Sequence, residues 1–236
     1  DHRDLHSFPT RRSSDLSFDD LNNEAKYELN SLKNSYAIGG VDLSSTTDLT
    51  AAVLVIQKKD DTKKYVLAHF FMPSDVVKKR MEEDNVPYDI WIKRGLITLT
   101  DGSQNDFSLV TQWFMRMIQE HQIRPLWVGF DPWNSQYWIK EMEELGFNME
   151  KVRQGVYSLS EPMKQLEADL KNKLINYDNN PILKWCLSNT QAKVDLNGNI
   201  QPSKLNSKYK RIDGTVALII AYAVLNRYKL DYENII

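Results

Sequence analysis

The stretch that decides the fold reads YAIGGVDLSSTTDLTAAVLVIQ and covers residues 36–57. Within it, residues 37–43 form a run of small apolar side chains that carries Asp42 near its end, and residues 49–57 form a second run rich in β-branched residues. Both runs predict β-strands, as does a third apolar run over residues 65–72. Because short polar segments join the three runs, we expect an antiparallel three-strand meander.

The sequence downstream adds helices and a parallel strand. Apolar side chains recur at helical spacing over residues 105–122, and the apolar run 125–130 follows directly. This order of strand, helix and strand predicts a parallel crossover. The other expected elements are a helix over 75–84, a helix capped by Asn134 or Ser135 and ended by Gly146, a helix opened by Ser160 and Pro162, a hairpin over 192–203 with a two-residue turn at Asn197 and Gly198, and a buried helix over 214–227. The expected fold class is α/β, a mixed sheet with an antiparallel meander plus parallel strands, flanked by helices.

The first residues differ in character from the rest of the chain. The segment HSFPTRRSSDL, residues 6–16, is polar and aperiodic and resembles the conceptual translation of a DNA-sequencing adapter. We therefore expect residues 1–16 to be a non-native or disordered tail that packs against nothing, with a natural disordered tail as the alternative. Residues 17–35 then predict a linker with a short surface helix, and residues 36–231 the folded domain.

Composition limits the function. The chain has 236 residues, 42% hydrophobic and 26% charged, which suits one sizeable core. Its single cysteine, Cys186, excludes a disulfide framework and a thiolate metal cluster. No apolar run reaches the roughly 20 residues that span a bilayer, and the first residues lack the pattern of a secretory signal, so we expect a cytoplasmic protein. The net charge of −2 argues against a polyanion-coating protein but leaves room for a local basic patch.

Three aspartates lie where apolar elements end or begin. Asp42 closes the first predicted strand, Asp131 directly follows the strand 125–130, and Asp213 precedes the buried C-terminal helix. If the first and fourth strands are neighbours, Asp42 and Asp131 project from adjacent strand ends, and the helix start brings Asp213 to the same site. Clustered carboxylates repel one another, so we expect a divalent cation among them and convergence of the three within a few ångströms.

The residue types indicate which cation this would be. Oxygen ligands without cysteine or a positioned histidine favour Mg²⁺ or Mn²⁺ over zinc. Two such ions about 4 Å apart can activate a water and stabilise the leaving oxygen of a phosphodiester. We expect Asp48 at the rim of the site, as a further ligand or a base. Simpler interpretations are that Asp131 initiates a turn, Asp213 caps a helix and Asp48 is a loop residue.

Short motifs in a fixed order resemble those of one protein family. GGVDLSSTTDLTA at residues 39–51 resembles the first acidic motif of the nuclease domain of tailed-phage large terminase subunits, which has a ribonuclease H-like fold. GFDPWN at 129–134 resembles the second acidic motif, and KRIDGTVAL at 210–218 the third. Further likenesses are RGLITLT at 94–100, Gln154–Gly155, LSEPMK at 159–164 and NPILKW at 180–185. Each motif alone is weakly specific, whereas their joint order over residues 36–227 is specific.

This resemblance implies a function. It implies that Asp42, Asp131 and Asp213 bind two catalytic Mg²⁺ or Mn²⁺ ions, with Asp48 at a fourth acidic position used in some members. The implied activity is hydrolysis of phosphodiester bonds in concatemeric double-stranded DNA during genome packaging, in the cytoplasm of the infected bacterial host. The implied partners, in a full-length protein, are an ATPase domain, the small terminase subunit and the portal. The sequence contains no G-x-x-x-x-G-K-[ST] phosphate loop, so we do not expect ATP-driven translocation from this chain.

A basic segment directly precedes Asp213. The basic side chains between residues 201 and 212, with no acidic residue among them, are Lys204, Lys208, Lys210 and Arg211. Phosphate contacts there would place the DNA backbone near the metal ions, and Lys193 on the predicted hairpin is a weaker candidate. The alternative is a solvated basic loop. Base-specific readout is not expected, because the sequence has no recognition-helix motif.

Other functions fit parts of the sequence. Residues 42–46 resemble a strand-turn phosphate motif of actin-like or sugar-kinase ATPases, although those proteins need two comparable lobes and more glycine-rich loops. Other ribonuclease H-like nucleases, of the resolvase, transposase or integrase type, share the metal chemistry. A third alternative is an interaction module without activity. Mn²⁺-dependent plasmid cleavage supports a nuclease and a nucleotide-dependent thermal shift supports a kinase-like fold, whereas an inert module shows neither.

Overall fold

The computed structural model describes residues 11–12, 16–45, 49–133, 136–204 and 210–236. Its strands are β1 (Arg11–Arg12), β2 (Tyr36–Asp42), β3 (Thr50–Gln57), β4 (Lys64–Pro73), β5 (Ile97–Thr100), β6 (Arg124–Phe130), β7 (Met149–Lys151), β8 (Ile175–Asn176), β9 (Thr190–Val194) and β10 (Ile200–Lys204). Its α-helices are α1 (Phe18–Leu21), α2 (Val77–Asp84), α3 (Tyr88–Lys93), α4 (Ser108–Gln119), α5 (Gln136–Glu144), α6 (Val156–Lys171), α7 (Pro181–Ser188), α8 (Asp213–Arg227) and α9 (Lys229–Ile235). Short 3-10 helices cover Leu29–Leu32 and Ser74–Val76.

A mixed sheet with the strand order β5-β4-β3-β2-β6-β7 forms the centre of the molecule, and β8 also pairs with β4. The predicted meander is confirmed, because β2 pairs antiparallel with β3, and β3 with β4. The predicted parallel crossover is also confirmed, because β6 pairs parallel with β2. Since β5 is parallel to β4 and β7 to β6, the carboxyl ends of β2, β4, β5, β6 and β7 share one edge of the sheet with the start of β3.

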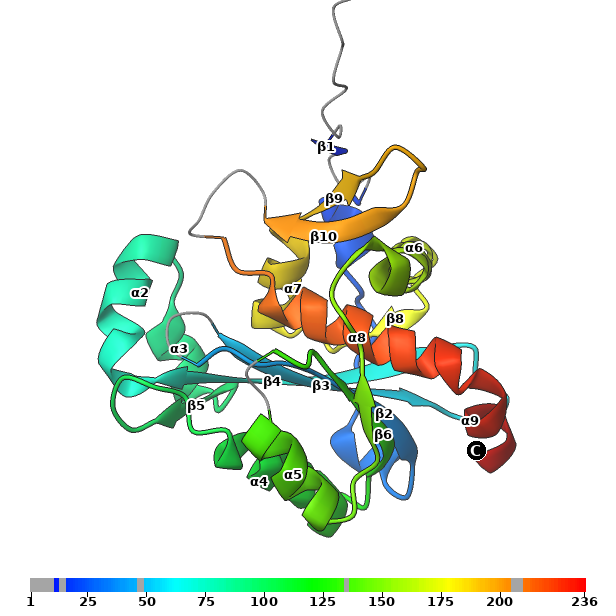
Figure 1. The fold of residues 1–236 in the computed structure, drawn as a ribbon, viewed down its shortest axis with the longest axis horizontal. Coiled ribbons are helices and arrows are strands. Elements are labelled where there is room, and N and C mark those ends of the chain that lie inside the picture. The colour runs from blue at the N-terminus through cyan, green and yellow to red at the C-terminus, as the bar shows by residue number, and fades with distance from the viewer. Residues whose placement is uncertain (1–10, 13–15, 46–48, 134–135, 205–209) are drawn as a thin grey trace, which may run out of the picture.

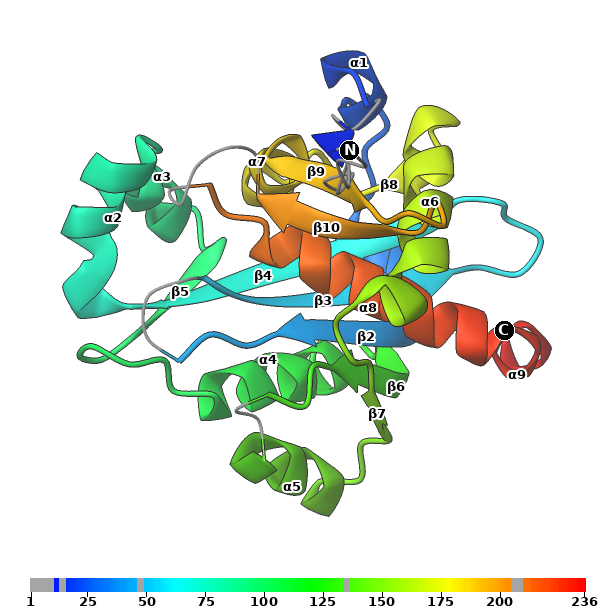
Figure 2. The same cartoon turned by 45° about the horizontal axis from the view of Figure 1, so that its top comes forward.

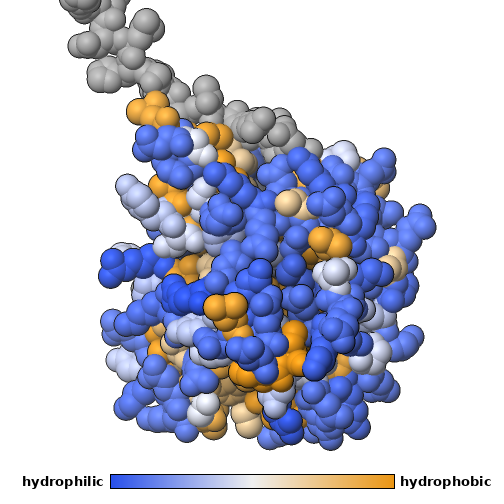
Figure 3. All heavy atoms as spheres, turned by 90° about the vertical axis from the view of Figure 1, so that its right-hand side faces the viewer, coloured by the Kyte–Doolittle hydropathy of each residue, from blue (hydrophilic) through white to orange (hydrophobic). Residues whose placement is uncertain are grey.

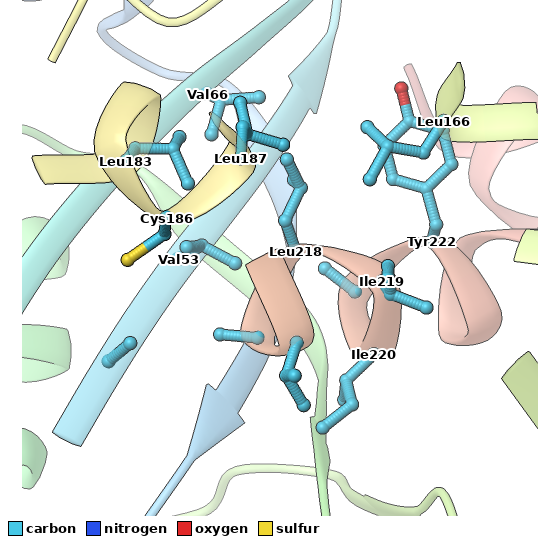
Figure 4. Packing of buried hydrophobic residues seen from close by; sticks show 14 of the residues in the cluster. Val53, Val66, Leu166, Leu183, Cys186, Leu187, Leu218, Ile219, Ile220 and Tyr222 are labelled. Atoms are coloured by element: carbon cyan, nitrogen blue, oxygen red, sulfur yellow. The ribbon is translucent and has the colours of Figure 1, made fainter. Parts of the chain in front are cut away.

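Helices cover both faces of this sheet. Figure 1 shows α4 and α5 on one face, and α6, α7 and α8 on the other. Each face has its own apolar core, and the α7 side chains Leu183, Cys186 and Leu187 face α8 in the larger one (Figure 4). A small sheet of β1, β9 and β10 lies beyond α7 and α8. The surface seen in Figure 3 is mostly hydrophilic, with small hydrophobic groups between the polar ones. Among the described helices, none is both long and apolar enough to cross a membrane.

Helix α8 lies directly on the middle of the sheet because glycines in β2 and β6 leave room for it. A Cβ atom placed on Gly40 would come within 2.6 Å of the Ala221 nitrogen and closer still to the Ala217 carbonyl oxygen. A Cβ atom on Gly129 would lie 2.7 Å from Cγ2 of Ile220. The helix is buried almost all round, as its uninterrupted apolar sequence predicts. The two glycines therefore fix how closely α8 approaches the strands.

One buried ion pair ties β4 to the helix layer. Lys64 Nζ lies 2.9 Å from Asp169 Oδ2 on α6, and the two side chains are 10% and 11% exposed. The hydroxyl of Tyr222 on α8 donates a hydrogen bond of 2.8 Å to the same carboxylate oxygen. Burial, and then the negative charge of Asp169, raise the pKa of Tyr222, so the phenol stays protonated and acts as the donor. This group anchors the middle of α8 far from its N-terminal end.

The region before β2 contains the expected short helix, α1, but the residues before Ser17 differ from the prediction. Residues 17–35 form only α1 and a 3-10 helix with extended chain between them, because Asn23 donates its side-chain amide to the Ile175 carbonyl instead of continuing a helix. The expectation that residues before Ser17 pack against nothing is wrong at two places. The residues of β1 pair with β9, and Leu16 packs against the larger core. Pairing with an edge strand uses backbone groups, so it requires no particular side chains.

Two other local predictions are wrong for identifiable reasons. Helix α6 begins at Val156, ahead of the predicted opening, and contains Pro162. Ser160 does not cap this helix, because its Oγ accepts a hydrogen bond of 3.0 Å from the Ile200 amide of the hairpin. The predicted hairpin of β9 and β10 is present, but its register, Val194 opposite Ile200, leaves a loop longer than two residues. The Asp195 carboxylate shapes that loop by accepting hydrogen bonds from its backbone.

Replacing Gly40 with alanine should destabilise the protein. The added methyl group would collide with the backbone of α8, which cannot move without disturbing the core, so we expect a loss of about 1–3 kcal/mol in the free energy of unfolding. Gly39→Ala is the matched control, because its Cβ would meet only side-chain atoms, at 3.0 Å and beyond. Urea unfolding of both variants measures the difference. Equal stability of the two variants would contradict this account of the packing.

Candidate metal centre

Strand register places Asp42 and Asp131 side by side. In the parallel pair of β2 and β6, Val41 is the partner of Phe130. Asp42 is the last residue of β2 and Asp131 directly follows β6, so they take equivalent positions at the ends of neighbouring strands that are about 4.8 Å apart. Both residues are partly exposed. The expected pairing of the first and fourth strands is confirmed, and it places Asp42 and Asp131 at adjacent strand ends.

Helix α8 begins at the same edge of the sheet. Asp213 is its first residue and is buried. The following residue, Gly214, packs on Phe70 of β4. Phe70 pairs with Ala51 of β3, which in turn pairs with Asp42, so the helix starts over the row of the sheet that contains Asp42. Figure 2 shows the N-terminal end of α8 and the end of β2 on one side of the molecule.

The thiol of Cys186 responds to two of these charges. Burial is the main cause that raises its pKa, and the negative charge of Asp213 and then of Asp42 raises it further. Hydrogen bonds from the backbone amides of Gly214 and Thr215 act in the opposite direction. The thiol therefore stays protonated at neutral pH.

The three carboxylates do not form a ready-made metal cage. Within the ranges that the structure describes, no three His, Cys, Asp or Glu side chains gather closely enough to hold an ion, so the expected convergence within a few ångströms is not met there. Like charges repel, and the Asp131 carboxylate accepts a hydrogen bond of 3.1 Å from the Trp133 amide in its own turn. Asp131 is thus also the turn initiator of the simpler interpretation. Asp48 lies outside the described residues.

The simpler interpretation of Asp213 is wrong. Ile212 occupies the cap position of α8, with no side-chain hydrogen bond to the helix, and Asp213 is already inside the first turn. A carboxylate in the first turn is favoured by the helix dipole, but it is not needed there as a cap. Its buried position beside a sheet edge that carries two more aspartates is typical of a functional side chain.

Two polar residues that the sequence did not single out hold the loop after Asp42. The buried Thr50 hydroxyl accepts a hydrogen bond from the Ser44 amide and donates one to the Ser44 carbonyl, each 3.0 Å long. The Asn105 side-chain amide donates to the same carbonyl at 2.7 Å, and the Asn105 backbone amide donates to the Ser45 carbonyl at 2.9 Å. Asn105 is 61 positions from Ser44, so only the folded chain reveals this support.

The predicted DNA contacts fall into two groups. Lys193 is exposed on β9, and Lys204 and Lys210 flank residues 205–209, which include Lys208 and lie outside the described part. Arg211 is placed differently. Its side chain is only 3% exposed and pairs with the fully buried carboxylate of Asp84. That placement does not fit the prediction that Arg211 contacts phosphates.

The side chains at this edge suit a hard divalent cation. Asp42, Asp131 and Asp213 offer carboxylate oxygens at this edge. His69 is turned away from the edge, because its ring stacks on Trp113 and its Nε2 lies 2.7 Å from the Thr98 hydroxyl. Oxygen ligands of this kind match Mg²⁺ or Mn²⁺ better than zinc.

Structural comparison confirms the ribonuclease H-like fold. The crystal structure of the HK97 bacteriophage large terminase resembles this chain with a TM-score of 0.73 and 27% identity, covering 80% of this chain and 39% of that one. The large terminase nuclease of thermophilic phage G20c gives a TM-score of 0.57 at 13% identity and covers 90% of this chain and 98% of that one. At that identity the second likeness shows the fold alone.

Sequence comparison agrees with the structures. The terminase large subunit of Enterobacteria phage HK97 is 29% identical over 189 residues, which cover 79% of this chain and 37% of that protein. Protein YmfN of Escherichia coli strain K12 is 27% identical over 76% of this chain and 41% of its own length. The chain thus spans less than half the length of these relatives. The family model "Terminase large subunit, endonuclease domain" matches residues 10–227, so the chain belongs to the terminase large subunit endonuclease family and not to the actin-like or sugar-kinase proteins.

Proposed function

We propose that this chain is a metal-dependent endonuclease domain that hydrolyses phosphodiester bonds of double-stranded DNA. The observation that supports this most is the strand register, which puts Asp42 and Asp131 at adjacent strand ends, with Asp213 starting α8 at the same edge. Membership of the terminase endonuclease family supports the same activity. Acidic side chains brought together from distant parts of the chain serve to hold cations, since they would otherwise repel one another.

In this proposal, Asp42, Asp131 and Asp213 are the ligands of two Mg²⁺ or Mn²⁺ ions. When bound, a pair of such ions supplies an activated water and stabilises the leaving oxygen of the phosphodiester. The nuclease of phage G20c has been crystallised with bound magnesium and with bound cobalt, and it shares the fold at a TM-score of 0.50 and 12% identity in each case. We propose Asp48 as a further ligand or a base at the rim of the site.

The chain's own residues fix the position of the ligands. The hydrogen-bonded strands β2 and β6 hold the backbones of Asp42 and Asp131, so only rotation of the side chains is needed to bring these carboxylates together. Thr50 and Asn105 hold the loop that follows Asp42. A rigid scaffold of this kind lowers the cost of gathering the charges, because little backbone order must be gained on metal binding.

For DNA binding, we propose phosphate contacts from Lys204, Lys208, Lys210 and, more weakly, Lys193. The segment from Lys204 to Lys210 leads directly into the helix that carries Asp213, so a phosphate held there lies near the proposed metal site. Arg211 is left out of this group, because it is buried against Asp84. Such contacts position the DNA backbone and carry no base specificity.

The biological setting is also a proposal. We propose that the domain cuts concatemeric DNA during genome packaging in the cytoplasm of an infected bacterium, as part of a longer protein with an ATPase domain, and that it acts with a small terminase subunit and a portal. We further propose residues 36–231 as the nuclease domain, residues 17–35 as its linker and residues 1–16 as a non-native segment.

Single replacements of Asp42, Asp131 or Asp213 with asparagine should abolish metal-dependent cleavage. Each removes one anionic ligand, so we expect Mn²⁺-dependent nicking of plasmid DNA to fall by about a hundredfold or more. Asp231→Asn on α9 is the matched control, because it removes an exposed carboxylate at the opposite end of α8. Unchanged cleavage by any of the three site variants would remove that residue from the ligand set, and loss of cleavage in the control would show a non-specific effect.

Charge reversal in the basic segment should weaken DNA binding. We expect the Lys208→Glu, Lys210→Glu double variant to lose affinity and to flatten the dependence of log K on log salt concentration by about one unit per lost phosphate contact. Titration of labelled duplex DNA at several salt concentrations measures both effects. The control, Lys59→Glu with Lys63→Glu, makes the same charge change in the exposed turn at the other edge of the sheet. Equal losses in the two double variants would indicate only a general charge effect.

A further inference from the structure

Asp84 and Arg211 form a buried clamp that joins helix α2 to the segment before α8. Arg211 Nε lies 3.0 Å from Asp84 Oδ2, and Nη2 lies 3.1 Å from Oδ1, so the guanidinium binds the carboxylate through two parallel hydrogen bonds. The two side chains are 3% and 0% exposed. This two-point geometry orients both groups, unlike the single contact that a lysine would make.

Two further residues complete the clamp. The hydroxyl of Tyr88, at the start of α3, donates a hydrogen bond of 2.7 Å to Asp84 Oδ2. Burial and then the charge of Asp84 raise the pKa of Tyr88, so its hydroxyl remains a donor. On the other side, the Asn189 side-chain amide donates to the Arg211 carbonyl at 3.1 Å. Arg211 is therefore held at its side chain by Asp84 of α2, which Tyr88 also binds, and at its backbone by Asn189, the residue that follows α7.

Apolar packing holds the start of α8, with Ile212 and Val216 in the larger core, but this packing has little directional specificity. The cap residue, Ile212, has no side chain that can hydrogen-bond to the free amides of the first turn. The next residue after Asp213 is Gly214, which has no side chain and lies against Phe70. Asp213 follows Arg211 by only two residues, so fixing Arg211 restricts where the Asp213 carboxylate can lie. A buried ion pair contributes little to stability on average, and its best-supported role is to specify one arrangement.

We propose that Asp84 is a positioning residue for the metal site, acting through Arg211 to hold Asp213 at the sheet edge beside Asp42 and Asp131. This inference rests on the proposed function, in which Asp213 is a metal ligand. Asp84 itself lies 127 positions before Arg211 in the sequence and is not a ligand. It acts on the backbone that carries a ligand, in the way that outer groups orient the ligands of other metal sites.

The first test needs neither metal nor DNA. Hydrogen exchange of peptides that cover residues 210–218 reports the opening of the first turn of α8, whose Val216 amide bonds to the Ile212 carbonyl. In Asp84→Asn we expect exchange in these peptides to speed up by about fivefold or more, with little change in β2 and β3. Unchanged exchange in residues 210–218 of a folded Asp84→Asn protein would overturn the proposal.

The second test measures metal affinity. By Mn²⁺ titration followed by electron paramagnetic resonance, Asp84→Asn should bind Mn²⁺ about tenfold or more weakly than the unaltered chain. Arg211→Lys keeps the charge but loses the two-point geometry, so its affinity should lie between the two. A wild-type chain that neither binds Mn²⁺ nor cleaves DNA would refute the proposed function, whereas the exchange experiment would still decide whether the clamp orders Asp213.

The control separates positioning from stability. Asp169→Asn breaks the other buried ion pair, Lys64 with Asp169, which anchors the middle of α8 through Tyr222. It should lower the melting temperature as Asp84→Asn does, while exchange in residues 210–218 and Mn²⁺ affinity stay close to those of the unaltered chain. If Asp169→Asn weakens Mn²⁺ binding as much as Asp84→Asn, the effect of Asp84 is general destabilisation and the positioning role is wrong.

Discussion

The close approach of helix α8 to strands β2 and β6 is the constraint on which the rest of the structure depends. Gly40 and Gly129 have no side chains, so the backbone of α8 can lie against the sheet where any larger residue would collide with it. This contact sets the height and direction of the helix over the strands. Because the helix crosses the sheet from β4 towards β6, its N-terminal end comes to the edge at which β2 and β6 finish, and Asp213 is its first residue.

The chemistry of the edge follows from this geometry. Strand pairing puts Asp42 and Asp131 at adjacent strand ends, and the buried helix starts with Asp213 at the same edge. Polar contacts hold the connecting segments, with Thr50 and Asn105 on one side and Asp84 and Arg211 on the other. The acidic groups therefore sit on backbones that are fixed by the apolar core. In the proposed function, such a scaffold needs little rearrangement of its backbone to accept an ion.

Much of this arrangement could be predicted from the sequence. Long runs of apolar residues with a clear period predicted the meander, the strand before Asp131 and the buried helix α8. These elements could be predicted because the burial of their side chains shows directly in the apolar pattern. Predictions from short local motifs were wrong where a tertiary contact uses the same side chain. Ser160 and Pro162 resemble a helix start, yet the Ser160 hydroxyl is used by the hairpin, and Asp195 reshapes a turn that Asn197 and Gly198 alone would make tight. The burial of Arg211 could not be foreseen, because its partner Asp84 lies in a helix whose sequence is that of a charged surface helix.

The central claim is that Asp42, Asp131 and Asp213 are ligands of divalent ions. The most direct measurement is anomalous X-ray diffraction from crystals of this chain grown with Mn²⁺. The account predicts Mn²⁺ peaks at the carboxyl ends of β2 and β6, within coordination distance of all three carboxylates. Peaks that contact none of these residues, at saturating Mn²⁺ and with the edge accessible to solvent, would contradict it.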